Sequence, residues 1–262
     1  MTTDEKKLSR ETIIQTLANA LKSLDYVHAF WEGGAAAFNR IDEWSDIDIY
    51  LLVDDDKVEQ TFLAVEKELK ALSPIKQKYD VPQTAWPGVF QAFYKLETTS
   101  EYLLIDLAIL TLSSKERFLE PEIHGNNVFY FNKDNMIKPP SLDKQAFASK
   151  LRKRQERLEA RFKVFNIFVQ KEINRRNYLE AIDLYYAVTL ATLVEALRIK
   201  YNPFHHDFKM RYIHHELPPR IIHRLKQLFF VKNEKDLQEK YNKATEWFTE
   251  VLSETTERAE KS

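Results

Sequence analysis

The stretch FWEGGAAAFNRIDEWSDIDIYLLV, residues 30–53, decides the fold of the chain around it. It contains a glycine pair, a spacer of eleven residues and then Asp46-Ile47-Asp48 at the start of a run of β-forming residues. Side chains alternate across a strand, so Asp46 and Asp48 point to one face and Ile47 points to the other. Two neighbouring carboxylates repel each other unless a cation lies between them. Oxygen ligands of this kind suit a hard divalent ion, Mg²⁺ above all.

Composition limits the classes of protein to which the chain can belong. Its 39 Lys and Arg residues balance 40 Asp and Glu residues, so no global field attracts nucleic acid or an anionic membrane. The absence of cysteine excludes disulfides and thiolate metal sites. The N-terminus is polar, and no apolar run reaches the ~18 residues of a membrane span. We expect a cytoplasmic protein whose partners include neither a membrane nor nucleic acid.

Glycine is scarce and unevenly placed. The chain has only four glycines, and two of them, Gly33 and Gly34, are adjacent. Glycine permits backbone conformations and close approaches that a side chain would prevent. Its concentration at this point predicts close contact between the backbone and a ligand.

The first half of the chain predicts a mixture of helices and strands. Apolar spacing predicts a helix over residues 8–24 and strands over residues 26–31, 47–53, 76–81, 89–96, 102–110 and 127–131. Asp56, followed three residues later by Glu59, predicts a capping box that opens a helix ending near Leu72. Short helical turns are expected at residues 35–38 and 115–119. Apolar residues on both faces of the 102–110 strand predict that it is covered on both sides.

The second half predicts helices only. Residues 132–143, which contain Asn135, Pro139 and Pro140, form the best domain boundary. Helices are expected over residues 144–174, 178–201, 204–215, 220–230 and 236–259. We therefore expect an α+β fold, with a mixed β-sheet and flanking helices in residues 1–138 and a helical bundle in residues 139–262.

A third carboxylate, Asp106, lies in the middle of the apolar strand. Unpaired in an apolar layer it would cost several kcal/mol, which favours a functional role. If its strand lies beside residues 47–53, Asp46, Asp48 and Asp106 would together bind two Mg²⁺ ions that clamp the attacking and leaving oxygens of a phosphoryl or nucleotidyl transfer. Asp106 would also help to deprotonate the acceptor hydroxyl. The glycines would let backbone N–H groups approach phosphate oxygens.

The motif also resembles a known family. Gly33-Gly34, a spacer of eleven residues that ends in Ser45, and Asp46-Ile47-Asp48 resemble the signature of the DNA polymerase β-like nucleotidyltransferase superfamily, with Asp106 matching its third carboxylate. A catalytic sheet domain followed by a helical bundle is similar to the aminoglycoside and lincosamide adenylyltransferases. The resemblance implies ATP or another nucleoside triphosphate as donor. One departure is Gly34, which stands where the family commonly has a serine whose hydroxyl binds the nucleotide phosphates.

The residues and the resemblance together predict an Mg²⁺-dependent transfer of a nucleoside monophosphate, AMP from ATP, to a hydroxyl group of a small molecule such as an aminoglycoside-like antibiotic. Two alternatives stay open. The acceptor could be a protein, such as a toxin–antitoxin partner, or the chain could be a catalytically silent protein that binds nucleotide or a partner. The helical domain could also form a homodimer.

Two residues beside the motif have open roles. Arg40 would bind phosphate as a guanidinium fork or lie on the surface. Ser45 would support the nucleotide and metal site or simply begin the strand.

Several residues of the helical half are weaker candidates. The pairs His205-His206 and His214-His215 lack regular zinc-ligand spacing, which favours a partly exposed helix and loop. The basic run at residues 152–154 is typical of a solvated helix face. The remaining candidates are core tyrosines or stacking groups, Tyr185 and Tyr186, and a possible substrate contact, Glu195.

Overall fold

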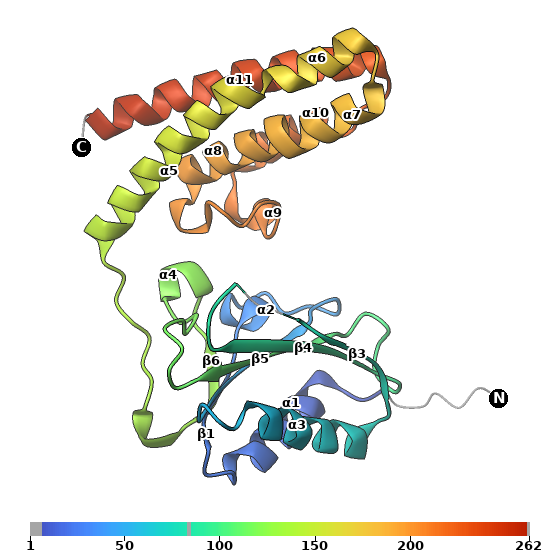
Figure 1. Cartoon of the computed structure of the whole chain (residues 1–262), viewed down its shortest axis with the longest axis vertical. Coiled ribbons are helices and arrows are strands. Elements are labelled where there is room, and N and C mark those ends of the chain that lie inside the picture. Colours follow the sequence, from blue (N-terminus) through green and yellow to red (C-terminus); the bar gives the residue numbers. More distant parts are fainter. Residues whose placement is uncertain (1–6, 83–84, 261–262) are drawn as a thin grey trace, which may run out of the picture. The chain divides into compact units, whose positions relative to one another are not determined.

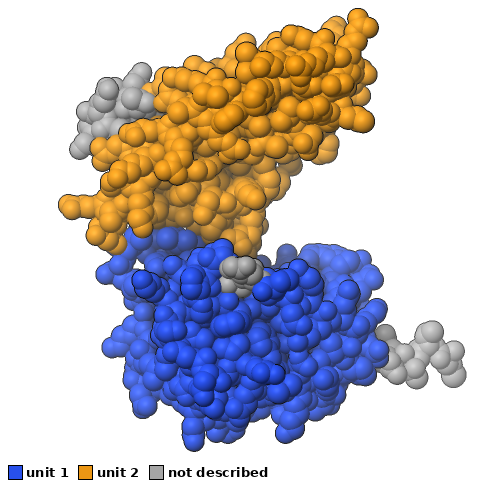
Figure 2. All heavy atoms as spheres, viewed as in Figure 1, with its two compact units in different colours: residues 1–142 blue, residues 143–262 orange. Residues whose placement is uncertain are grey.

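The computed structural model describes residues 7–82 and 85–260, and the chain divides into two compact units, residues 1–142 and 143–262 (Figure 2). The first unit is a mixed sheet with helices and the second is helical (Figure 1). This confirms the predicted α+β class and the order of its parts. Among the described residues, every helix is too short or too polar to cross a membrane.

The first unit holds the sheet. Its elements are α1 (Arg10–Lys22), β1 (Val27–Glu32), α2 (Gly34–Ala37), β2 (Ile47–Val53), α3 (Val58–Leu72), β3 (Ile75–Asp80), β4 (Val89–Leu96), β5 (Ile105–Thr111), α4 (Pro121–His124), β6 (Val128–Asn132) and the 3₁₀ turn η1 (Lys133–Asn135). The strand order is β3-β4-β5-β2-β1-β6. β2 and β5 run parallel at the centre, and every other neighbouring pair is antiparallel.

The two faces of the sheet have separate apolar cores. Helices α1 and α3 lie side by side on one face (Figure 1), where they pack on Ile47, Ile49 and the apolar residues of β5 that share this face. The opposite face is covered by a smaller cluster around Trp31, Leu52 and Leu110. The expectation that the Asp106 strand is covered on both sides is therefore confirmed. The period of two that places Ile47 and Ile49 against the helices places Asp48 on the other face.

Two local predictions in the first unit are wrong. Helix α3 begins at Val58 with Lys57 as its N-cap, and no side-chain hydrogen bond caps it. The Lys57 N–H instead closes a turn on the Asp54 carbonyl, while Asp56 pairs with the Lys57 ammonium at 3.1 Å. The expected capping box of Asp56 and Glu59 therefore does not form. Residues 115–119 are not helical, and the short helix α4 begins only at Pro121.

The second unit is a bundle of helices. Its elements are α5 (Lys144–Phe165), α6 (Ile167–Arg175), α7 (Tyr178–Leu184), the π-helical segment η2 (Tyr185–Leu190), α8 (Ala191–Tyr201), the 3₁₀ turn η3 (Pro203–His205), α9 (Ile213–Glu216), α10 (Pro219–Phe229) and α11 (Glu234–Glu260). Helix α8 is buried over most of its length, as its apolar sequence predicts. The continuous helix expected over residues 204–215 is replaced by η3, turns and α9.

The helix expected over residues 144–174 is interrupted at Asn166, which separates α5 from α6. The Asn166 side chain is buried. Its amide nitrogen donates to the hydroxyls of Tyr241 (3.2 Å) and Thr245 (3.0 Å), and its oxygen accepts a bond from Thr189 (2.6 Å). A buried amide must be hydrogen-bonded. These partners therefore tie the break to η2 and α11.

Candidate active site

Asp48 and Asp106 are brought together by strand register. In the parallel pair of β2 and β5 the two residues are direct partners. Neighbouring strands lie about 4.8 Å apart, so the two carboxylates leave the same face of the sheet side by side. The sequence predicted a joint role for these carboxylates only if their strands were neighbours, and the register of β2 and β5 meets this condition. Asp46, two residues earlier on the same parity, lies just before β2.

The glycine pair lies against Asp48. The Gly33 N–H donates to the Asp48 backbone carbonyl at 3.0 Å, which fixes the turn onto β2. Gly34 has a positive φ of 52°, and a Cβ atom placed on it would lie 1.8 Å from Asp48 Oδ2. A side chain at position 34 and the observed Asp48 carboxylate would therefore occupy the same volume. A Cβ atom placed on Gly33 would lie 2.7 Å from the ring of Tyr50.

Asp106 is largely buried and held by one neutral partner. Gln91 on β4 donates its side-chain N–H to Asp106 Oδ1 at 2.7 Å. Burial raises the pKa of Asp106 to about 6; the Gln91 hydrogen bond opposes this effect, and the charges of Asp48 and Asp46 add to it. The group therefore titrates close to neutral pH. Gln91 is a residue that the sequence did not single out.

Asp46 is fixed through both its side chain and its main chain. Its Oδ1 accepts a hydrogen bond from the Leu104 N–H at 3.3 Å, and its carbonyl accepts one from Arg10 at 2.5 Å. Burial raises the pKa of Asp46, while the Leu104 N–H and the charge of Arg10 oppose this shift. Arg10, in α1, was not expected near the site.

The three carboxylates are not preassembled as a closed metal cage. Within residues 7–82 and 85–260, no three Asp, Glu or His side chains converge as a ligand set for a metal ion. The donor chemistry of the site nevertheless fits a divalent cation, since Asp48 and Asp106 offer oxygen ligands from adjacent strands. The negative charge of Asp48 contributes to the raised pKa of Asp106. A divalent ion would neutralise the repulsion between these two carboxylates.

Ser45 and Arg40 lie in the loop between the glycines and β2. The Ser45 hydroxyl donates to Asp42 Oδ1 at 2.7 Å and accepts from the Asp42 N–H at 2.9 Å, so it closes a local turn. The Arg40 guanidinium lies over the Phe38 ring, 5.1 Å from its centroid. Roles for Ser45 and Arg40 in nucleotide binding stay predictions.

An exposed aromatic pair lies in the loops that precede β2 and β5. Trp44 and Tyr102 have exposed fractions of 57% and 54%, and their rings meet edge to face with centroids 4.8 Å apart. The loops that carry them are joined where Leu104 binds Asp46 and where the Ile47 N–H donates to the Leu104 carbonyl. Both rings therefore belong to the same edge of the sheet as the start of β2.

Most of the candidate functional side chains in the helical unit form hydrogen bonds or ion pairs within that unit. Arg154 holds Glu195 with two hydrogen bonds of 2.5 and 2.8 Å, and His206 lies 3.5 Å from the same carboxylate. Burial alone would raise the pKa of Glu195, but Arg154 and His206 lower it to about 2. Tyr185 and Tyr186 donate to backbone carbonyls of α10, which confirms their place in the core.

The histidine pairs do not form one cluster. His205 is buried and lies 2.8 Å from Glu216, with its ring stacked on Phe208. His214 and His215 are exposed on α9. The expectation of a partly exposed histidine segment is correct for the second pair and wrong for His205, whose partner Glu216 lies eleven residues along the chain.

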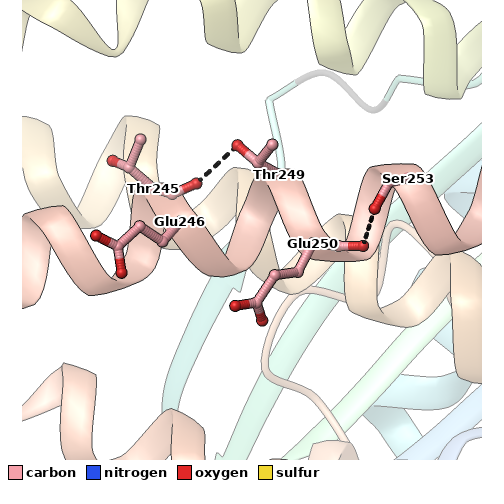
Figure 3. A pocket seen from close by; sticks show the side chains of 5 residues that line it. All are labelled: Thr245, Glu246, Thr249, Glu250 and Ser253. Atoms are coloured by element: carbon pink, nitrogen blue, oxygen red, sulfur yellow. Dashed lines mark hydrogen bonds between the residues drawn. The ribbon is translucent and has the colours of Figure 1, made fainter.

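A shallow hollow on the helical unit offers little to a ligand. The five residues that line it, shown in Figure 3, all belong to α11: Thr245, Glu246, Thr249, Glu250 and Ser253. The Thr249 and Ser253 hydroxyls donate to carbonyls of their own helix, and Glu250 pairs with Arg224 at 3.0 Å. The Thr249 and Ser253 hydroxyls and the Glu250 carboxylate are therefore already engaged within the protein.

Comparison with known proteins gives a structural likeness. No family model and no curated protein matches the chain. The chain is similar to an aminoglycoside 6-adenyltransferase from Bacillus subtilis, with 13% identity and a TM-score of 0.36 over 95% of this chain and 91% of that chain.

Two further solved structures are similar to the chain over different shares of its length. A cytoplasmic RNA terminal U-transferase is 19% identical, with a TM-score of 0.25 over 41% of this chain and 31% of its own. A STING-associated CdnE c-di-GMP synthase from Capnocytophaga granulosa is 13% identical, with a TM-score of 0.29 over 95% of this chain and 84% of its own. At these TM-scores the chemistry has to be argued from the residues themselves.

The raised pKa of Asp106 predicts a dependence of stability on pH. The folded protein holds the Asp106 proton more tightly than the unfolded chain does, because the pKa rises from 3.8 to about 6. The resulting stability is fully present below pH ~4 and is lost as the pH rises through about 6. We therefore expect Asp106→Asn to be more stable than the wild type above pH 6, by at most ~3 kcal/mol, and to lose this advantage near pH 4.

Urea unfolding without divalent ions, between pH 4 and 8, measures this effect. Asp55→Asn is the matched control, because the Ser113 backbone N–H lowers the pKa of Asp55 and its substitution brings no gain at high pH. An advantage of Asp106→Asn that did not vary with pH would contradict the assignment.

Proposed function

We propose that this protein is an Mg²⁺-dependent nucleotidyltransferase that transfers a nucleoside monophosphate, AMP from ATP, to a hydroxyl group of a small molecule. One observation carries the proposal: Asp48 and Asp106 are register partners on adjacent strands, with the Gly33-Gly34 turn packed directly on Asp48. Paired carboxylates beside a tight glycine turn suit a cation and a phosphate chain in contact with each other.

The residues of the site have separate roles in this reaction. Asp46, Asp48 and Asp106 would hold Mg²⁺, which when bound neutralises charge on the transferred phosphate. The acceptor oxygen bonds to the α-phosphorus, the bond to pyrophosphate breaks, and Asp106 accepts the hydroxyl proton. Asp106 suits this step because its carboxylate leaves the sheet beside Asp48, at the proposed cation.

The glycine turn would bind the donor through its backbone. Because the Gly33 N–H is engaged by the Asp48 carbonyl, contact with phosphate oxygens would fall to the N–H groups of Gly34 and Ala35, which open α2. Gly33 itself serves the shape of the turn, since a Cβ there would meet Tyr50. The donor is therefore bound without a side-chain hydroxyl from position 34.

The exposed side chains in the loops beside the carboxylates favour an acceptor that carries a positive charge and a ring. The exposed pair of Trp44 and Tyr102 can pack on a sugar or other ring, and aromatic faces attract cations. The same loops carry the carboxylates of Asp42, Glu43 and Glu101. This combination favours a hydroxylated amine, of which an aminoglycoside-like antibiotic is one example, as the acceptor.

Pyrophosphate release tests the proposal. Purified protein is given each nucleoside triphosphate with Mg²⁺ and a panel of acceptors containing aminoglycosides, a lincosamide and neutral sugars. We expect release with ATP and a cationic hydroxylated acceptor, and a loss on the order of 10³-fold in Asp48→Asn. Asp56→Asn is the matched control, because Asp56 is exposed and pairs only with its neighbour Lys57.

The other outcomes separate the alternatives. Label from ATP that appears on a protein would favour a protein acceptor. Nucleotide binding that needs no Mg²⁺ and is unchanged in Asp48→Asn, without turnover on any acceptor, would favour a catalytically silent protein.

A further inference from the structure

Arg10 connects two parts of the carboxylate site. It is the first residue of α1, and its guanidinium reaches two different segments. One nitrogen donates to the backbone carbonyl of Asp46 at 2.5 Å, with a longer contact of 3.5 Å to the carbonyl of Ser45. The other nitrogen donates to the carboxylate of Glu32. The Arg10 side chain is only 11% exposed; its bond to Glu32 is partly buried, and its bond to the Asp46 carbonyl lies at the surface.

Glu32 holds Arg10 in this orientation. It is the last residue of β1, directly before Gly33, and its side chain is 2% exposed. Its second carboxylate oxygen accepts a hydrogen bond from the Tyr130 hydroxyl of β6 at 2.9 Å. Both oxygens of Glu32 are therefore engaged. The chain of contacts runs from β6 through β1 and α1 to the residue that precedes β2.

The segment that receives this contact has few other long-range supports. Ile41, Asp42, Glu43 and Trp44 are exposed, and the Ser45 hydroxyl bonds only within its own turn. Beyond that turn, the described contacts that hold Asp46 are the Leu104 N–H on its side chain and Arg10 on its carbonyl. Leu104 thus holds the Asp46 carboxylate itself, while Arg10, from another layer of the unit, holds the backbone that carries it.

A buried ion pair is a poor way to gain stability alone. Taking two charges out of water costs several kcal/mol, and apolar residues of similar volume often stabilise a protein equally well or better. The forked, planar guanidinium can instead join two acceptors in a fixed geometry, which a lysine ammonium does not do. The arrangement therefore fits a role in positioning.

We propose that Arg10 is a positioning residue of the carboxylate site, which Glu32 and Tyr130 orient so that it fixes the Ser45–Asp46 backbone and aims the Asp46 carboxylate toward the cation beside Asp48. The part of this proposal that concerns the cation rests on the proposed function. The part that concerns the backbone does not.

The test separates positioning from stability. Arg10→Met alone leaves Glu32 buried without its cation, and we expect a lower melting temperature. The triple variant Arg10→Met, Glu32→Leu, Tyr130→Phe removes all the polar groups together, and we expect it to regain the melting temperature. It should still bind Mn²⁺ about tenfold more weakly than the wild type in a titration followed by electron paramagnetic resonance, and the Ile47 amide should exchange its hydrogen at least about tenfold faster.

Two further variants sharpen the result. Arg10→Lys keeps the charge but not the forked guanidinium, so the Ile47 amide should exchange as fast in this variant as in the triple variant. Lys22→Met removes the other cation of α1, which is exposed, and should leave both exchange and Mn²⁺ binding unchanged. A triple variant with wild-type exchange at Ile47 would overturn the proposal, as would one with wild-type Mn²⁺ affinity. If the wild type bound no Mn²⁺ while the triple variant still exchanged faster, the proposed function would fail and the anchoring role of Arg10 would stand.

Discussion

Gly34→Ser is expected to lower Mg²⁺-dependent nucleotide binding on the order of 100-fold, although it adds a hydroxyl group beside the carboxylates. The new Cβ would lie 1.8 Å from Oδ2 and 2.4 Å from Cγ of Asp48, so the carboxylate would have to leave its present position. The φ of 52° adds strain, since a left-handed conformation costs a non-glycine residue about 1–3 kcal/mol. The hydroxyl would therefore be gained only by displacing a proposed metal ligand.

Calorimetric titration with a non-hydrolysable ATP analogue, with and without Mg²⁺, measures the effect. Gly88→Ala is the matched control, because Gly88 also has a positive φ and a crowded Cβ position, against Thr111 and Ser114. The control should lose stability and keep its affinity for Mg²⁺ and nucleotide. An affinity of Gly34→Ser equal to or above that of the wild type would show that Asp48 is not needed where it lies.

Arg198→Met is expected to destabilise the helical unit by about 3–5 kcal/mol, the usual cost of leaving one member of a buried pair uncompensated. The Arg198 side chain is fully buried. It donates to Glu216 at 2.6 Å, to the Lys209 carbonyl at 2.7 Å and to the Arg211 carbonyl. Its loss would remove the donor to Glu216 Oε2 and to two carbonyls, while His205 stays beside Oε1, and the segment between α8 and α10 would lose its attachment to α8.

Urea unfolding followed by circular dichroism, together with hydrogen exchange over residues 202–217, measures this loss. Arg224→Met is the control, since Arg224 and Glu250 form an ion pair whose side chains are about half exposed and which should contribute less than ~1 kcal/mol. Arg198→Met combined with Glu216→Leu should recover part of the stability. Equal losses in the two arginine variants would contradict the role assigned to the buried pair.

The strands of the site could be predicted because their patterns are local. β2 has the predicted bounds, since Ile47, Ile49 and Leu51 alternate with residues of the opposite face. The pairing of Asp48 with Asp106 could not be predicted, because a register between residues 58 positions apart leaves no mark in either strand. The break at Asn166 was missed for the same reason, since its partners lie far along the chain.

One missed residue did leave a signal. Arg10 occupies the first position of α1, after the N-cap Ser9. A cation there opposes the helix dipole, which favours acidic residues in the first turn. Such a placement suggests that the side chain is needed by a partner elsewhere in the fold. His205 gave no comparable sign, because its burial depends on Phe208 and on Glu216, the last residue of the short helix α9.

The contact between Gly34 and Asp48 also limits how this sequence can change. Aspartate is the shortest side chain that carries a carboxylate, so no substitution at position 48 makes room for a side chain at position 34 and keeps the acid in place. A path by single substitutions toward a serine at position 34 would therefore pass through a protein with a displaced or missing Asp48. Serine at position 34 and Asp48 in its present place are therefore mutually exclusive.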